Sequence, residues 1–312
     1  MFGLLKKAAE AQGRVGLVFS ADRLAVAVVR SNAERPVLER CESIAIDPSG
    51  GAEAVSTAVR TAGLPRLPVS VVLRPDDYQL ALVEAPEVPP AELRAAMRWR
   101  LKEAIDFQVD DAVIDVFEVP PQNRGGQGRM VYAVAARRGA VERYAAALTA
   151  LPSFDVVDVP ELCLRNLAAV LPAAARGVAL LHLGDTTATC VLVQGRTFYL
   201  SRQIALRPAA SATGGDAASE LLDAESIVLE LQRSLDYYER HFDQPPITRI
   251  AISPAGARAE ALATDLSRDT GFEVSALDLY SALNCTLPFT PAPQADCLLA
   301  IGAALREERR SL

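Results

Sequence analysis

Two stretches of the chain share one pattern of apolar and polar positions. In each, two short apolar runs enclose a polar turn, at residues 20–23 and again at 184–189. Apolar runs on either side of a short polar turn are typical of β-hairpins. Each predicted hairpin opens one half of the chain, and further strands and helices follow in both halves. The pattern therefore predicts two similar α/β lobes, residues 14–176 and 177–310.

The first half contains a unit in which the spacing of apolar residues is different. After Pro89 and Pro90, apolar residues recur every four positions in a stripe typical of an amphipathic helix: Leu93, Met97, Leu101 and Ile105. Three predicted strands accompany this helix and a second helix follows them, at 78–85, 112–119, 129–136 and 138–151. This order predicts a small α/β subdomain inserted into lobe one over residues 78–151.

The second half contains a long predicted helix, residues 218–242. Leu231, Leu235, Tyr238 and Phe242 lie on one of its faces, and the prolines that follow at 245 and 246 stop it. A strand at 248–253, a helix, a strand at 272–276 and a last helix at 296–308 complete the predicted lobe.

Composition narrows the classes of function. The chain has 312 residues, half of them apolar, and its net charge is −7. An acidic chain lacks the clustered cations that phosphate binding needs, so no nucleic-acid partner is expected. Its five cysteines show no C-x-x-C spacing and no adjacent histidines, so neither a metal site nor a disulfide framework is predicted; they are expected to be reduced, buried thiols.

The chain has no apolar run of the roughly 20 residues that would span a bilayer, and we expect a cytoplasmic protein. In residues 1–13, Met1, Leu4, Leu5 and Ala8 lie at helical spacing beside two lysines. Weak contact of residues 1–8 with an anionic membrane is one interpretation of this amphipathic segment. A frayed terminal turn, or a lid on the core, is the favoured one.

Motifs of the common enzyme classes do not occur. The chain has two histidines, no G-x-S-x-G, no Walker-type phosphate loop and no G-x-G-x-x-G after a strand, so no catalytic residue is predicted. We expect His182, inside an apolar strand, to be a hydrogen-bonded structural residue. Trp99 lies off the apolar stripe of its helix, and both a partner-binding anchor and packing on a neighbouring subdomain fit it.

Two segments carry a resemblance to a known family. Residues 90–119, PAELRAAMRWRLKEAIDFQVDDAVIDVFEV, and residues 229–242, LELQRSLDYYERHF, are similar to the PilM family of type IV pilus biogenesis proteins. Within it, the chain most resembles the MshI-like members of mannose-sensitive haemagglutinin (MSHA) pilus systems. The resemblance covers nearly the whole chain. It implies the two-lobed α/β actin-like ATPase fold shared with FtsA, with the inserted subdomain in lobe one and a reduced cap on lobe two.

In this fold the resemblance implies an ATP site between the lobes. In the first hairpin turn the corresponding positions are Ser20 and Asp22. In the second they are Gly184, Asp185, Thr186 and Thr187, and in the turn that would hold the adenosine, residues 253–256, they are Ser253 and Gly256. Val18 and His182 stand where the family has acids, and Pro254 removes a backbone donor from the adenosine turn. We therefore expect a degenerate site with no cofactor, no metal and no ATPase activity. The alternative is Mg-ATP bound through displaced ligands, with Asp185 on the magnesium.

The resemblance also implies a partner, the cytoplasmic tail of a PilN-like inner-membrane protein, in a groove between the main part of lobe one and the inserted subdomain. The residues placed in that groove are Val71, Leu73, Leu80, Leu82 and Trp99. The expected function is a cytoplasmic adaptor of a pilus assembly platform, held at the inner membrane through this partner. An ATP-hydrolysing relative and the cytoplasmic domain of a type II secretion L-like protein are the alternatives, and homo-oligomer formation stays open.

Overall fold

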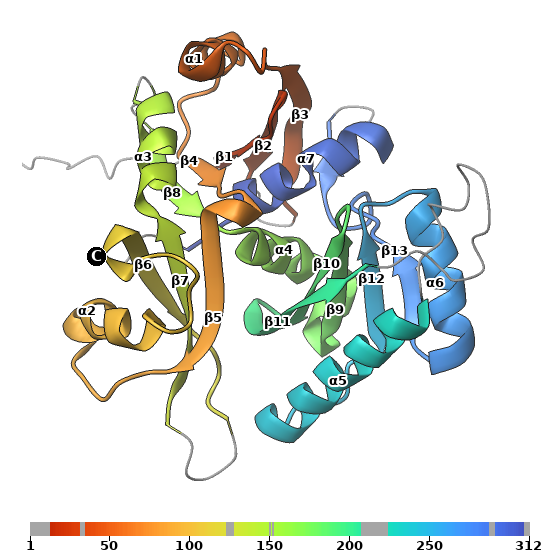
Figure 1. The fold of residues 1–312 in the computed structure, drawn as a ribbon. Helices are drawn as coiled ribbons and strands as arrows, with labels where there is room; N and C mark the ends of the chain where they lie inside the picture. Colours follow the sequence, from red (N-terminus) through yellow and green to blue (C-terminus); the bar gives the residue numbers. More distant parts are fainter. Residues whose placement is uncertain are drawn as a thin grey trace, which may run out of the picture.

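The computed structural model describes residues 13–31, 35–122, 128–149, 151, 153–206, 224–286 and 291–308. Its strands form three sheets, of six, five and three strands (Figure 1). The predicted amphipathic segment up to residue 12, the hairpin tip at 123–127 and the region of the reduced cap, 207–223, lie outside the described residues.

The six-stranded sheet forms lobe one, in the order β14-β3-β2-β1-β4-β8. Its strands are β1 (Arg14–Phe19), β2 (Arg23–Arg30), β3 (Val37–Ala45), β4 (Val69–Val72), β8 (Phe154–Asp158) and β14 (Asn284–Cys285). Helix α1 (Gly51–Thr61) packs on one face of this sheet through Ala58 and Val59. Strand β14 comes from the second half of the chain and pairs in parallel with β3, so residues 177–310 do not all belong to the second lobe's sheet.

The inserted subdomain is the three-stranded antiparallel sheet with two helices. Its elements are β5 (Tyr78–Glu84), α2 (Pro90–Leu101), β6 (Ala112–Glu118), β7 (Met130–Arg137) and α3 (Arg138–Ala147), and two short 3-10 turns, η1 (Pro75–Asp77) and η2 (Val109–Asp111), precede β5 and β6. Leu93, Met97 and Leu101 are buried against one face of the sheet, as the stripe predicts. Strands β5 and β6 are the edges and β7 is the centre.

Lobe two is built on the five-stranded sheet, in the order β11-β10-β9-β12-β13. Its elements are β9 (Val178–Leu183), β10 (Thr187–Gln194), β11 (Thr197–Ala205), α5 (Ala224–Phe242), β12 (Arg249–Ser253), α6 (Ala257–Thr270) and β13 (Glu273–Ala276). Leu231, Leu235, Tyr238 and Phe242 of α5 are buried against it, on the predicted face.

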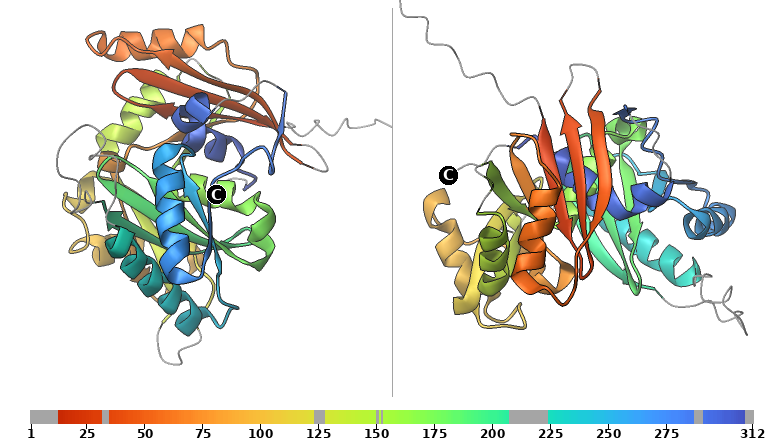
Figure 2. Two further views of the ribbon diagram at one scale, coloured as in Figure 1. Left: turned by 90° about the vertical axis from the view of Figure 1, so that its right-hand side faces the viewer. Right: turned by 90° about the horizontal axis from the view of Figure 1, so that it is seen from above.

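Two helices lie between the lobes, α4 (Pro160–Ala169) and α7 (Pro291–Ala304), and η3 (Pro172–Arg176) leads from α4 into lobe two (Figures 1 and 2). Close approach of their backbones requires glycine at two positions. A Cβ on Gly16 of β1 would lie 1.9 Å from the carbonyl oxygen of Ala300, and one on Gly302 would lie 2.4 Å from that of Cys163. These contacts seat α7 directly on lobe one and on α4.

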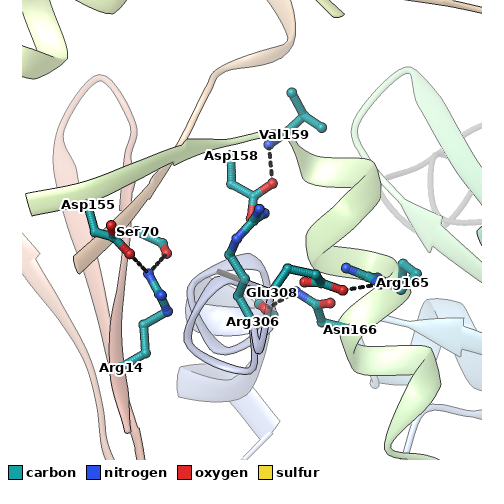
Figure 3. Close-up of polar contacts among 10 residues, drawn as sticks. Arg14, Ser70, Asp155, Asp158, Val159, Arg165, Asn166, Arg306 and Glu308 are labelled. Carbon is teal, nitrogen blue, oxygen red and sulfur yellow. Dashed lines mark hydrogen bonds and ion pairs between the residues drawn. The ribbon is translucent and has the colours of Figure 1, made fainter. Parts of the chain in front are cut away.

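The segment after α7 is held by three consecutive ion pairs, which we call the C-terminal clamp. Arg306 pairs with Asp158 of β8 at 2.8 Å, Glu307 with Arg196 of lobe two at 3.0 Å, and Glu308 with Arg165 of α4 at 2.5 Å. Figure 3 shows the Arg306–Asp158 and Glu308–Arg165 pairs near each other, beside a further lobe-one pair, Arg14 with Asp155. Three neighbouring residues thus bind both lobes and the helix between them.

Sequence patterns did not predict several elements. Strands β3, β8, β11 and β14 and helix α1 carry no separate prediction, and α7 begins five residues earlier than the predicted last helix. The half-buried strand β3 lacks a regular alternation of apolar and polar residues, and β14 has only two residues. In the part of the chain that the structure describes, no helix is long and apolar enough to cross a membrane.

Candidate functional site

The first hairpin turn joins β1 to β2 and is held by its own polar groups. The Ser20 amide donates to the Arg23 carbonyl oxygen at 2.9 Å, and the Ser20 hydroxyl donates to the Asp22 carboxylate at 3.4 Å. Arg23 pairs with Asp22 at 3.5 Å and with Asp296 of α7 at 3.0 Å. The carboxylate of Asp22 therefore lies in an exposed cluster in which two acids share one arginine.

Val18 lies two residues before this turn, on the face of β1 that meets the connecting helices. It packs against the buried cluster of Val72, Cys163 and Ala303. These are apolar or thiol side chains, and none of them supplies an oxygen ligand of the kind that magnesium prefers. A carboxylate at position 18 would have to be placed against this apolar cluster.

The second turn joins β9 to β10 and is tighter. The Gly184 amide donates to the Thr187 carbonyl oxygen at 2.9 Å, and a Cβ on residue 184 would lie 2.7 Å from that same oxygen. Asp185, Thr186 and Thr187 are all exposed at this turn. Glycine is thus needed by the turn itself, whether or not a phosphate ever binds there.

His182 and Ser253 meet beside the second turn, because β9 and β12 are neighbours in register. The His182 Nδ1 and the Ser253 hydroxyl are 3.2 Å apart, and Ser253 is completely buried. Burial lowers the pKa of His182 to about 4, so the imidazole is neutral at pH 7. An uncharged ring thus lies where the resemblance implies an acid.

The turn after β12 leads into α6. Pro254 follows Ser253, and Gly256 precedes the helix with φ of +146°, a conformation that residues with a side chain rarely adopt. Arg258, in the first turn of α6, donates from Nη1 to the Gly184 carbonyl oxygen at 2.9 Å. Arg258 therefore joins the turn after β12 to the second hairpin turn.

Sequence reasoning missed Arg258. No local motif distinguishes it from other helical arginines, and only the packing of α6 beside the β9–β10 turn brings its guanidinium there. Its guanidinium places a cation at the second hairpin turn, which also carries the exposed Asp185. Among the described residues, no group of three or more histidine, cysteine or acidic side chains is arranged to hold a metal ion.

The residues predicted for the partner groove separate into three environments. Val71, on β4, and Leu73, just after it, are 0% and 4% exposed because both side chains belong to the lobe-one core. They offer no surface to a partner, which corrects their placement in the groove. Trp99 is 81% exposed on α2, away from the buried stripe of that helix.

Leu80 and Leu82 do line a groove, of about 790 Å³, between the inserted subdomain and lobe two. We call it the β5–β11 groove, because those two strands border it. Its lining comes from β5, β7, α4, β11 and α5, including Tyr78, Leu80, Leu82, Tyr132, Glu161, Ser201, Arg202, Gln203 and Tyr237. Both bordering strands are edges of their sheets, so each has one side without a neighbouring strand among the described residues.

The floor of this groove contains a buried acid. Glu161, 2% exposed, accepts a hydrogen bond of 2.6 Å from the Tyr78 hydroxyl. Burial raises the pKa of the Glu161 carboxyl, and burial together with the Glu161 charge raises the pKa of Tyr78. Tyr132 crosses the groove: its hydroxyl accepts from the Ser201 amide of β11 at 2.9 Å.

A second cavity, of about 490 Å³, lies between the lobe-one core and helix α3. We call it the α1–α3 cavity; it is lined by residues that include Phe19, Ser20, Ile46, Val55, Arg143 and Tyr144. Tyr144 donates to Asp77 at 3.0 Å at its edge. This cavity lies between the main part of lobe one and the inserted subdomain, where the resemblance implies the partner.

Comparison with solved structures identifies the fold. A chain of the PilM-PilN type IV pilus biogenesis complex is similar over 95% of this chain and 98% of its own length, with 21% identity and a TM-score of 0.67. A protein of unknown function with an actin-like ATPase fold from Bacteroides thetaiotaomicron aligns over 90% and 96%, with 8% identity and a TM-score of 0.50.

The cytoplasmic domain of EpsL, an inner-membrane component of the type II secretion system of Vibrio cholerae, aligns over 95% and 96%, with 15% identity and a TM-score of 0.47. No protein-family model and no curated protein matches the chain. The two-lobed actin-like ATPase fold predicted from the sequence is confirmed.

Proposed function

We propose that the protein is a nucleotide-independent adaptor on the cytoplasmic face of an inner-membrane type IV pilus assembly platform of the MSHA type. Its partner is the cytoplasmic tail of a PilN-like membrane protein, through which it is held at the membrane. The observation that carries this proposal is the end-to-end likeness to a chain of the PilM-PilN complex, over 95% of this chain and 98% of that one.

The chemistry of the candidate nucleotide site supports independence from ATP. Val18 offers no oxygen and His182 is neutral, so neither supplies the negative oxygen that would hold magnesium. Asp22 and Asp185 lie in or beside the turns that would meet phosphates. A carboxylate about 4 Å from a phosphate charge costs about 4 kcal/mol at an effective dielectric of 20.

The β5–β11 groove supports binding of an extended peptide. The Ser201 amide and carbonyl point away from β10, past the outer edge of β11, and both form hydrogen bonds with the Tyr132 hydroxyl. Alternate residues of a strand direct these groups to the same side, so Gln203 directs its own pair outward two residues further along. A peptide strand added at Gln203 would form backbone bonds there and place apolar side chains against Leu80, Leu82 and Leu200.

Two substitutions of Gln203 test this binding mode. Gln203 is exposed, and Gln203→Pro removes its amide hydrogen, whereas the matched control Gln203→Ala keeps it. Binding is measured by calorimetry. The ligands are synthetic peptides that cover the cytoplasmic segments of the PilN-like proteins of the same genome, and scrambled peptides are the controls. We expect one peptide to bind, Gln203→Pro to weaken it at least about tenfold, equivalent to about 1.4 kcal/mol, and Gln203→Ala to leave it unchanged.

The same peptides distinguish the two cavities. Val55→Arg places a charge in the α1–α3 cavity and leaves the β5–β11 groove unaltered. Binding that survives Gln203→Pro but is lost in Val55→Arg would place the tail in the α1–α3 cavity and refute the binding mode. If no PilN-like segment binds the wild-type protein, the adaptor function itself is refuted.

A further inference from the structure

Three of the five cysteines, far apart in the sequence, gather where α7 crosses the edge of the lobe-one sheet. Cys41 lies on β3, Cys285 on β14 and Cys297 on α7, and all three belong to or pack against one apolar cluster. Cys41 is paired with Ala27 of β2, which is in that same cluster, so the register of the sheet places both on the face that α7 covers.

Two of these thiols are in contact. The Cys297 Sγ donates to the Glu42 carbonyl oxygen at 3.3 Å, which places it against β3 at the residue next to Cys41. A hydrogen bond between the Cys41 and Cys297 side chains raises the pKa of the Cys41 thiol and lowers that of the Cys297 thiol. Cys41 is half-buried, whereas Cys297 has no exposed surface. Solvent therefore reaches this pair from the Cys41 side.

The other cysteines differ in their surroundings. Cys163 on α4 and Cys190 on β10 are buried with apolar side chains, in clusters that contain none of the three gathered cysteines. Cys285 lies near the pair, and its position in β14 is in register with Leu38, three residues before Cys41. The Cys41–Cys297 pair joins a hydrogen bond between the two side chains to one half-buried member, Cys41.

We propose that Cys41 and Cys297 form a modification site, a dithiol that closes to a disulfide when hydrogen peroxide reaches Cys41. The Cys41 thiolate attacks one peroxide oxygen, the O–O bond breaks, and Cys41 becomes a sulfenic acid. The hydroxide that leaves takes up the proton that the Cys41 thiol lost and becomes water. The Cys297 sulfur then attacks the Cys41 sulfur, the S–O bond breaks, and a second water forms. Two thiols are oxidised by two electrons, one peroxide is reduced to two waters, and both thiol protons end in water.

The hydrogen bond and burial set how fast the first step proceeds. The hydrogen bond with Cys297 and burial both raise the pKa of Cys41, so its thiolate is scarce at neutral pH. The rate of disulfide formation is therefore expected to rise steeply with pH. A dithiol of this kind responds to sustained oxidant rather than to brief exposure.

The disulfide would join strand β3 to helix α7 covalently. Asp296, the residue before Cys297, pairs with Arg23 of the first hairpin turn, and the same helix packs on α4 at Gly302. Closing a covalent loop between residues this far apart restricts the unfolded chain strongly. Oxidation is thus expected to raise the midpoint of thermal unfolding by several degrees and to hold α7 on lobe one.

The test uses the full-length protein treated with millimolar hydrogen peroxide, alkylated and digested without reductant. Peptide mapping by mass spectrometry is expected to show a linked pair of peptides containing Cys41 and Cys297, lighter by two hydrogens than the separate peptides and released by dithiothreitol. Cys41→Ser and Cys297→Ala should each abolish the linked pair and the rise in unfolding temperature. Cys285→Ser, the matched control, should keep both.

The wild-type peptide map decides the outcome even if Cys297→Ala fails to fold, because it needs no variant. Overoxidation of Cys41 without a linked pair, or a Cys41–Cys285 link in place of the Cys41–Cys297 link, would overturn the proposal. Formation of the link at the same rate at pH 6.5 and pH 8.5 would contradict entry of the oxidant through the Cys41 thiolate.

Discussion

At the residue scale, His182 shows how burial decides the chemistry of one side chain. Its ring lies among β-strand neighbours and contacts the buried Ser253 hydroxyl. Loss of water around the ring disfavours the imidazolium, and the pKa is lowered to about 4 from 6.5. The expectation from its apolar strand, that His182 is a hydrogen-bonded structural residue, agrees with this contact.

The low pKa makes His182 a source of acid sensitivity. In the unfolded chain the ring takes up a proton below about pH 6.5, but in the folded protein it does so only near pH 4. The unfolded state therefore binds more protons in this window, and stability falls as the pH falls through it. The loss attributable to His182 at pH 4 is expected to be about 3 kcal/mol, with the contribution fully retained above pH 6.5.

Urea unfolding at pH 7.5, 5.5 and 4.5 measures this acid sensitivity in the wild-type protein and in His182→Gln. The free energy of unfolding of the wild type should fall more steeply between pH 7.5 and 4.5 than that of the variant. His241, at the end of α5, is half-buried and bonded to the Tyr237 carbonyl oxygen, so His241→Gln is the control. Equal slopes for the wild type and His182→Gln would contradict the lowered pKa of His182.

At the scale of elements, the C-terminal clamp connects three of them through three adjacent residues. Asp158 ends β8, and its carboxylate accepts from the Val159 amide as well as from Arg306. The exposed fractions of the Asp158 and Arg306 side chains are 1% and 16%. An ion pair this deeply buried is costly to break, because the remaining partner keeps an uncompensated charge away from water.

Arg306→Ala is expected to lower the free energy of unfolding by about 3 to 5 kcal/mol. Arg268→Ala breaks an exposed pair with Asp265 and should cost less than about 1 kcal/mol. Replacing both buried partners, in Asp158→Asn with Arg306→Met, should recover part of the loss, since no unpaired charge is left. Chemical denaturation measures all three, and equal losses for Arg306→Ala and Arg268→Ala would contradict the buried pair.

At the scale of the whole molecule, the arrangement of the two lobes is that of an actin-like ATPase fold, and groups at its candidate nucleotide site pack and bond within the protein. Val18 packs into an apolar cluster, and Arg258 bonds to the Gly184 carbonyl oxygen at the second turn. A fold does not by itself imply a ligand, because the sheets and connecting helices are held by their own core.

We expect no saturable shift of the thermal unfolding midpoint with Mg-ATP or Mg-ADP up to millimolar concentrations. A ligand present at a hundred times its dissociation constant stabilises the folded state by about 2.7 kcal/mol, which such a scan detects readily. A saturable shift would refute nucleotide independence. Asp185→Asn would then test the displaced magnesium ligand, and Arg258→Ala the contact with phosphate.

Much of this molecule was determined by local patterns in the sequence. The two hairpins, the stripe of α2 and the buried face of α5 follow from periods of two and of 3.6 residues, since these periods decide which side of an element is apolar. The resemblance of residues 90–119 and 229–242 then led to the actin-like fold. The apolar side chain at Val18 and the imidazole at His182 were also predictable there, because both lie in short hairpins whose register needs no distant information.

Only the tertiary structure decided which of these faces meet. Several features depend on residues that are distant along the chain. They are the burial of Val71 and Leu73, the pairing of β14 with β3, and the contact of Cys41 with Cys297. The position of Arg258 and the C-terminal clamp also depend on contacts between distant parts of the chain. A periodic pattern tells which side of a strand or helix is apolar, but its neighbour depends on how all the elements pack together, and no local spacing contains that information.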